Sequence, residues 1–185
     1  MAKDIIAVIG ARKVGKTEAI ETLQRCSFGY SVTSPNYWAI KDFVTVNDMT
    51  LDDFFFHPSA GGDINFETHK RLMLLFKENQ ECHNPKKYLD MMDEEIFNLD
   101  RVLIDDIYTY DELCHVINLG ARLILIHADQ RKRDEMGYIK GMDNEFYVNE
   151  VGSITPDDVT NWKHTTVITN NGALDRFRFS LRSFI

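Results

Sequence analysis

The chain has 185 residues, a length that suits one domain with a substantial core but not two comfortable ones. Its formal net charge is −8 and its longest basic run is "RKR" at 131–133, which argues against a surface that binds a nucleic acid duplex. No apolar run approaches the roughly 20 residues that span a bilayer, and no N-terminal segment resembles a signal peptide. Three scattered cysteines form no metal-ligand spacing. These features predict a cytoplasmic protein that has no membrane contact.

The first predicted elements enclose a glycine-rich segment. "DIIAVI" at 4–9 is a mostly β-branched apolar run that predicts a buried parallel strand. Apolar residues at helical spacing over 19–26 predict a helix that stops near Gly29. Between them, "GARKVGKT" fits the pattern G-x-x-x-x-G-K-[ST] through Gly10, Gly15, Lys16 and Thr17. This pattern between a strand and a helix is typical of a loop that wraps the phosphates of a nucleotide.

Each part of that loop has an expected role. Its backbone N–H groups bind phosphate oxygens, assisted by the N-terminus of the helix. Lys16 reaches the β- and γ-phosphates, and the Thr17 hydroxyl binds Mg²⁺. The alternative is a glycine-rich turn with a solvated lysine, and the strand-loop-helix context argues against it. The predicted ATP-binding residues here are Gly10, Ala11, Arg12, Lys13, Val14, Gly15, Lys16 and Thr17.

The middle of the chain is less regular. Residues 30–35 predict a short second strand that Pro35 ends, and the pattern from 36 to 63 resembles a loop with aromatic anchors. Apolar positions predict a helix over 66–80. A second helix is expected to have Asn84 as its cap and Pro85 at its first position, with its apolar side running to Leu99.

The last third of the chain returns to alternating elements. Strands are predicted at 101–107, 122–128 and 165–170, and a capping box of Thr109 and Glu112 opens a helix closed by Gly120. "TPDD" at 155–158 predicts a short helix, and a final helix spans 174–184. Five strands that alternate with helices predict a three-layer α/β fold, a parallel sheet covered on both faces. No linker or repeat marks a boundary, so one domain over 1–185 is expected.

Two carboxylates, Asp105 and Asp106, end the predicted strand at 101–107. Ligands bind outside the carboxyl ends of parallel strands, so both would lie near the glycine-rich loop, on opposite faces by alternation. One could serve Mg²⁺ or the attacking phosphate while the other caps the next helix, and a purely structural role for both stays open. We predict that Asp105 and Thr17 are metal ligands and that Asp106 is a catalytic and acceptor-binding residue.

Basic residues follow the predicted strand at 122–128. Arg131, Lys132 and Arg133 begin a polar stretch, 129–153, whose glycines could let it close as a lid over the transferring phosphate. We predict that Arg131 and Arg133 are catalytic, and the alternative is a solvated charge cluster. Lys70 and Arg71, on the predicted helix at 66–80, could similarly clamp an acceptor phosphate.

Several segments together resemble the nucleoside monophosphate kinases, most closely the deoxynucleoside monophosphate kinases encoded by bacteriophages. "LIDDIYTYDELCHVINLGARLILI" resembles the family's strand-Asp-x-Arg-x-x-x-Glu-helix-Gly-strand segment, with Asp106, Glu112 and Gly120 on its positions. "SVTSPNYWAIKDF" is similar to the substrate-side segment through Pro35 and Lys41, while "THKRLMLLF" and "NPKKYLDMM" look like the acceptor-side helices. "NEFYVNEVG" resembles the acidic end of the lid through Glu150, and "VITNNGALDRF" the turn beside the donor base through Asn170 and Gly172.

The resemblance covers nearly the whole chain and implies a P-loop NTPase fold. It implies transfer of the γ-phosphate of ATP, with Mg²⁺, to a (deoxy)nucleoside monophosphate. It also implies an acceptor region at about 34–99 and a lid at about 129–153, and it leaves both a monomer and a homodimer open. By this likeness Asn170 and Gly172 join the ATP-binding set. Lys41 and Glu150 join Lys70, Arg71 and Asp106 as acceptor-binding residues.

Two departures from the family qualify that function. Tyr108 stands where the family has an arginine, and Tyr147-Val148-Asn149-Glu150 replaces a His-x-Ser-Glu lid. Lys70 or Arg71 would then substitute for the arginine, or the activity is altered or lost. The alternatives are therefore a nucleotide-binding protein without kinase activity, regulatory or structural, and a kinase of another small metabolite.

Overall fold

The computed structural model describes residues 3–26, 29–55, 63–137 and 150–185, and for 63–70 it describes the backbone only. The chain divides into two compact units. The sheet unit comprises residues 1–33 and 96–185, and the helical unit comprises residues 34–95. The helical unit is thus inserted between two parts of the sheet unit, and its bounds nearly match the region predicted to bind an acceptor. That role stays a prediction.

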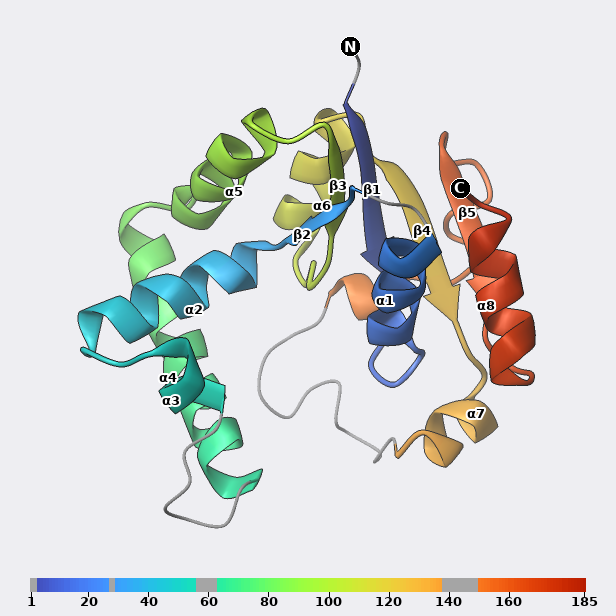
Figure 1. Ribbon diagram of the computed structural model, residues 1–185. Helices are drawn as coiled ribbons and strands as arrows, with labels where there is room; N and C mark the ends of the chain where they lie inside the picture. The colour runs from blue at the N-terminus through green and yellow to red at the C-terminus, as the bar shows by residue number, and fades with distance from the viewer. Residues whose placement is uncertain (1–2, 27–28, 56–62, 138–149) are drawn as a thin grey trace. The chain divides into compact units, whose positions relative to one another are not determined.

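The sheet unit is built on five parallel strands in the order β2-β3-β1-β4-β5 (Figure 1). Four of the predicted strands are shorter than expected by one to three residues, and in three of them the pairing stops before a polar residue, Ser34, Asp105 or Asn170. The strands are β1 (Asp4–Ile9), β2 (Ser31–Thr33), β3 (Arg101–Ile104), β4 (Arg122–His127) and β5 (Thr165–Thr169). In β1, β3 and β4 the central side chains are buried on both faces, which explains the unbroken apolar runs in the sequence, whereas β5 at the sheet edge is mostly exposed.

Helices cover both faces of this sheet, as predicted. Helices α1 (Lys16–Cys26) and α8 (Leu174–Arg182) lie together on one face and α6 (Tyr110–Asn118) lies on the other (Figure 1). Leu23, Phe177 and Leu181 bury the inner sides of α1 and α8. Outside that core an ion pair joins the Arg178 guanidinium to the Glu18 carboxylate at 2.7 Å. The Thr109–Glu112 capping box of α6 is present as predicted.

The helical unit contains helices where the sequence pattern indicated a loop. Helices α2 (Pro35–Val46) and α3 (Leu51–Phe55) occupy much of the segment 36–63, so that prediction was wrong for them, and residues 56–62 lie outside the described part. The Ser34 hydroxyl caps α2 by accepting from the Tyr37 amide at 2.9 Å, and Pro35 opens its first turn. Helix α4 (Asp63–His83) is longer than predicted, and α5 (Lys87–Phe97) starts two residues later than expected.

Two further differences concern the last third of the chain. "TPDD" is followed by turns and not by a helix, because Val159 is the one buried residue from 155 to 161 and no apolar stripe forms. Conversely, the polar stretch contains α7 (Gln130–Glu135), capped by Asp129, and a short 3₁₀ turn, η1 (Val151–Ser153). Within the described ranges, none of these helices is both long and apolar enough to cross a bilayer.

Candidate active site

The glycine-rich loop follows β1 and enters α1, as the motif requires. Gly10 has φ +142° and Gly15 has φ +101°, which are backbone conformations that favour glycine. A Cβ at residue 10 would lie 2.3 Å from the Ile126 carbonyl oxygen of β4, and one at residue 15 would lie 2.7 Å from the Asn170 side-chain nitrogen. Both glycines are therefore needed for the loop to approach its neighbours this closely.

Side chains from two distant parts of the chain fix the loop through its own carbonyl groups. The Asn170 amide, which is buried after β5, donates to the Val14 carbonyl at 2.9 Å. The Arg133 guanidinium of α7 donates to the Arg12 carbonyl at 3.0 Å. The sequence predicted that Asn170 lies beside the donor base, whereas its side chain here holds the phosphate loop. Gly172 lies in the exposed turn before α8.

Lys16, the first residue of α1, is half-buried and folds back over the loop. Its ammonium group donates to the carbonyl oxygens of Gly10 at 3.0 Å and Ala11 at 2.9 Å. These contacts hold a positive charge at the mouth of the loop and at the N-terminus of a helix of 11 residues. Positive charge and free helix N–H groups together favour an anion, so the geometry fits the phosphates of a nucleotide.

Asp105 lies beside this loop because β3 pairs with β1 and ends at the same edge of the sheet. Burial, and after it the negative charge of Asp106, raise the pKa of the Asp105 carboxyl to about 6, against the lowering effect of a backbone hydrogen bond from Asp106 and of the Lys16 charge. Its Oδ1 atom is buried and has no hydrogen-bond partner in the described part of the chain. A buried carboxylate oxygen without a partner is suited to binding a cation or a ligand hydroxyl.

Asp106 leaves the strand direction altogether. Its φ is +53°, a left-handed conformation, so strand alternation does not apply to it. The Tyr108 hydroxyl donates to its Oδ1 atom at 2.6 Å and holds the carboxylate in place. The tyrosine that replaces the arginine expected from the resemblance is thus a direct partner of the aspartate two residues before it.

The end of the predicted lid is attached to the start of α6. The Glu150 carboxylate accepts from the Tyr110 amide at 2.8 Å, and the Val151 amide donates to the Tyr108 carbonyl at 3.2 Å. The buried Glu112 carboxylate accepts from the amides of Tyr108 and Thr109. Glu150, predicted to bind an acceptor, therefore stabilises a helix N-terminus here. Residues 138–149, including the expected Tyr147-Val148-Asn149 segment, lie outside the described residues.

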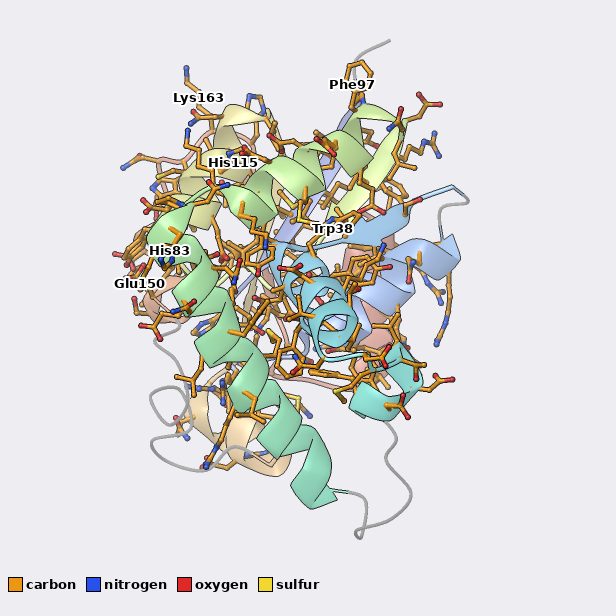
Figure 2. The ribbon with its side chains drawn as sticks, turned by 90° about the vertical axis from the view of Figure 1, so that its left-hand side faces the viewer. Trp38, His83, Phe97, His115, Glu150 and Lys163 are labelled. Atoms are coloured by element: carbon orange, nitrogen blue, oxygen red, sulfur yellow. The ribbon has the colours of Figure 1, made fainter. Side chains whose placement is uncertain are left out.

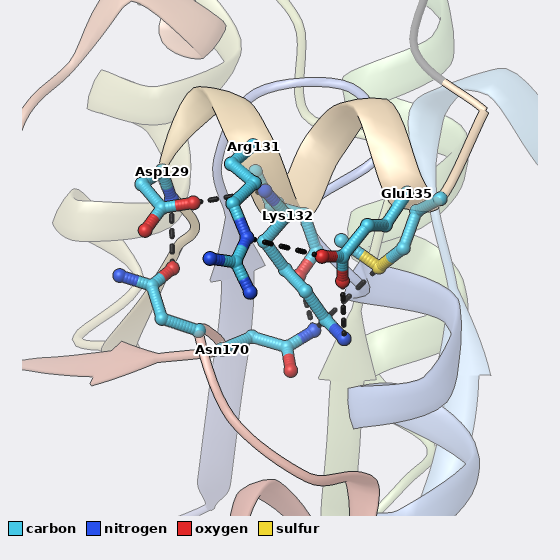
Figure 3. Close-up of polar contacts among 8 residues, drawn as sticks. Asp129, Arg131, Lys132, Glu135 and Asn170 are labelled. Carbon is cyan, nitrogen blue, oxygen red and sulfur yellow. Dashed lines mark hydrogen bonds and ion pairs between the residues drawn. The ribbon is translucent and has the colours of Figure 1, made fainter.

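The basic residues of α7 point in different directions. Arg133 reaches the phosphate loop, whereas the Arg131 side chain is 89% exposed and pairs with Glu135 on its own helix at 3.2 Å. Figure 3 shows Arg131 and Lys132 both paired with Glu135, beside Asn170. Of the two predicted catalytic arginines, the structure brings only Arg133 to the phosphate loop.

The predicted acceptor-binding cations belong to the helical unit. Lys41 lies on the ring of Trp38, 4.3 Å from its centroid, and Arg71 is exposed on α4. The side chain of Lys70 lies outside the described part. Lys77, two turns after Lys70 on α4, was not predicted: it is 7% exposed and donates to the Asn36 side chain at 2.8 Å. Its spacing of seven residues from Lys70 was the available signal, since that spacing repeats one helix face.

The residues of the sheet unit provide oxygen ligands of the type that Mg²⁺ prefers. Thr17 is exposed in the first turn of α1, and Asp105 offers an unpaired carboxylate oxygen. The described residues contain no group of three or more histidine, cysteine or acidic side chains that could cage a metal.

Comparison with solved structures identifies the fold. The chain is similar to TT1252 from Thermus thermophilus, with TM-score 0.57 and 16% identity over 99% of this chain and 96% of that one. It is also similar to a gluconokinase from Sinorhizobium meliloti 1021, with TM-score 0.52 and 10% identity over 99% of this chain and 91% of that one. The fold is that of the P-loop kinases. No protein-family model and no curated protein sequence matches the chain.

Proposed function

We propose that the chain is a phosphotransferase that moves the γ-phosphate of ATP, with Mg²⁺, to a (deoxy)nucleoside monophosphate. The observation that carries this proposal is the phosphate loop, whose Lys16 lies near Asp105, the residue after β3, at the carboxyl edge of the sheet. Bound Mg²⁺ and ATP would supply the transferable group and neutralise its charge. The resemblance to nucleoside monophosphate kinases, which covers nearly the whole chain, supports a nucleotide as the acceptor.

The residues of the chain would share the work as follows. The loop amides and the N-terminus of α1 bind the donor phosphates, and Lys16 exchanges its two carbonyl partners for phosphate oxygens. Thr17 and Asp105 hold the metal. Asp106, positioned by the Tyr108 hydroxyl, orients the acceptor. Phosphoryl transfer depends on position and positive charge more than on an acid or base, which agrees with this set of groups.

A second candidate is a kinase of another small metabolite. Tyr108 in place of an arginine favours it, because that change removes a cation expected for a monophosphate acceptor, and a solved gluconokinase shares the fold.

One experiment separates these candidates. A panel of nucleoside and deoxynucleoside monophosphates, with gluconate and nucleosides as further acceptors, would be incubated with ATP and Mg²⁺. Formation of ADP and of one diphosphate product supports the proposal. ADP formed only with a non-nucleotide acceptor supports the second candidate, and ATP binding without turnover supports a nucleotide-binding protein.

A further inference from the structure

A hollow lies at the amino ends of β4 and β5, at the opposite end of the strands from the phosphate loop. Its volume is about 470 Å³, within the range of about 300–1,000 Å³ that is usual for small-molecule sites. One wall is apolar and consists of Ile117 on α6, Ala121, Leu123 on β4 and the half-buried ring of Trp162. All of these residues belong to the sheet unit.

The other wall is basic. Arg122, Lys163 and His164 line it, and no acidic side chain belongs to the lining, every member of which is described. That is unexpected in a chain with 29 acidic and 21 basic residues. An ion pair with Asp4 at 2.8 Å holds Arg122 in place. Lys163 is exposed and projects outward (Figure 2). Arg122 is balanced by Asp4, so the positive charge that has no acidic partner in the lining is that of Lys163. Such a charge beside an apolar wall favours an anion that also has an apolar body.

One feature of the lining has no partner within the described part of the fold. His164 has φ +60° in the turn before β5, and its carbonyl is fixed to β4 by the Leu123 amide at 2.9 Å. The next residue, Thr165, has a buried hydroxyl with no hydrogen-bond partner among the described residues. An unpaired buried polar group of this kind calls for an explanation, and a ligand that supplies the missing partner is one.

We propose that this hollow is a second binding site, for a small aromatic carboxylate. The aromatic body would lie against Trp162 and Leu123. The carboxylate would bind Lys163 and Arg122 and accept from the Thr165 hydroxyl. The site is separate from the phosphate loop, so the inference is independent of the proposed kinase activity.

Fluorescence of Trp162 tests the proposal with benzoate as the probe and benzyl alcohol as the uncharged match. The chain has two tryptophans, so Trp38→Phe leaves Trp162 as the single reporter. We expect a saturable change with benzoate. Binding of benzoate should be about tenfold weaker after Lys163→Ala, which removes one charge-assisted contact. Benzyl alcohol should bind at least as weakly to the unaltered site, because it lacks the carboxylate that both Lys163 and Arg122 would contact. Calorimetric titration of the unaltered chain with both compounds provides the same comparison if Trp38→Phe does not fold.

Matched variants locate the binding. Lys86→Ala removes an exposed lysine of the helical unit and should leave the benzoate affinity unchanged, as should Lys16→Ala in the phosphate loop. A second hollow of about 660 Å³ shares Arg122, His164 and Thr165 but is also lined by Phe179, not by Trp162. Phe179→Ala should therefore have no effect. No saturable benzoate signal, equal binding of benzyl alcohol, or loss of binding in Lys16→Ala or Phe179→Ala would each overturn the proposal.

Discussion

The sheet unit and the helical unit hold their polar groups in different ways. At the carboxyl edge of the sheet, Asn170 and Arg133 bind backbone carbonyls of the phosphate loop, whose position follows from strand register. In the helical unit, side chains bind side chains: Lys77 binds Asn36, and Lys87 and Tyr88 both bind Asp42, across 41 to 46 residues of sequence. The sheet-edge site is therefore held through backbone carbonyl groups whose positions follow from strand register, whereas the helical unit is held by contacts between side chains.

The largest effect should come from the phosphate loop of the sheet unit. Lys16→Ala removes the charge expected to stabilise the transferring phosphate, so kcat should fall on the order of 10²–10³-fold. The melting temperature should change little, because Lys16 is not part of the core. Lys163→Ala, which removes an exposed lysine at the opposite end of the strands, is the control and should keep most of the activity. Wild-type turnover of Lys16→Ala would remove the loop from the reaction.

Gly15→Ala tests whether the phosphate loop depends on the close approach of its backbone to Asn170. The added Cβ would lie 2.7 Å from the Asn170 side chain at a φ of +101°, so we expect a loss of about 2–4 kcal/mol in the free energy of unfolding. Gly120→Ala also has a positive φ, +81°, but has open space around its Cβ, and should lose only about 1 kcal/mol. Equal losses in urea denaturation would show that the close approach to Asn170 is not needed.

Asp105→Asn should stabilise the chain in a pH-dependent way. Because burial raises the pKa of Asp105 from 3.8 to about 6, the ionised carboxylate destabilises the folded state above that pH. The variant should gain about 1–3 kcal/mol in the free energy of unfolding near pH 8, and the gain should disappear as the pH falls toward 4.

Asp158→Asn is the control for that experiment and should have the opposite sign. Hydrogen bonds from Thr155 lower the pKa of Asp158, so this carboxylate stabilises the folded state, and the stabilisation is lost as the pH falls through its folded-state pKa. If the difference in unfolding free energy between Asp105→Asn and the unaltered chain does not vary with pH, the ionised Asp105 carboxylate does not destabilise the folded state as expected.

The helical unit is tested through the acceptor. If Lys70 or Arg71 binds the acceptor phosphate, its change to Ala should raise the acceptor KM with little effect on the KM of ATP. A loss of about 1.5–3 kcal/mol, roughly 10–150-fold, is expected for one charge-assisted contact. Lys77→Met is the informative third variant. If the acceptor KM rises in Lys77→Met alone, the buried Lys77 binds the acceptor phosphate. If the acceptor KM is unchanged in all three variants, the acceptor binds elsewhere.

The smallest effect is expected at Tyr108. Tyr108→Phe removes the hydroxyl that holds Asp106 and should reduce kcat by about fivefold, equivalent to about 1 kcal/mol. Tyr110→Phe is the control, since the Tyr110 hydroxyl lies 3.4 Å from Ser153, a weaker contact. Steady-state kinetics of both variants with the same acceptor decide the point. Equal rates would show that the Tyr108 hydroxyl does not position Asp106.

The sequence predicted the sheet unit better than the helical unit, for physical reasons. Buried strands produce continuous apolar runs, and the phosphate loop has a fixed pattern that specifies its neighbours, so both could be predicted. Helix α2 was missed although Ser34 and Pro35 are good opening residues, because its apolar side chains do not follow a clear helical stripe. Helix α7 has no buried residue, so it leaves no periodic signal. The support of the loop by Asn170 and Arg133 depends on tertiary contacts across more than 100 residues.

Phosphorus NMR of a mixture of the chain, ATP, Mg²⁺ and one monophosphate tests the central claim most directly, because it separates transfer, hydrolysis and simple binding. The account predicts that the β-phosphate signal of a nucleoside diphosphate made from the acceptor appears as the ATP signals decline, and that Lys16→Ala abolishes this change. Release of inorganic phosphate alone, or unchanged ATP with every monophosphate of the panel, would contradict it.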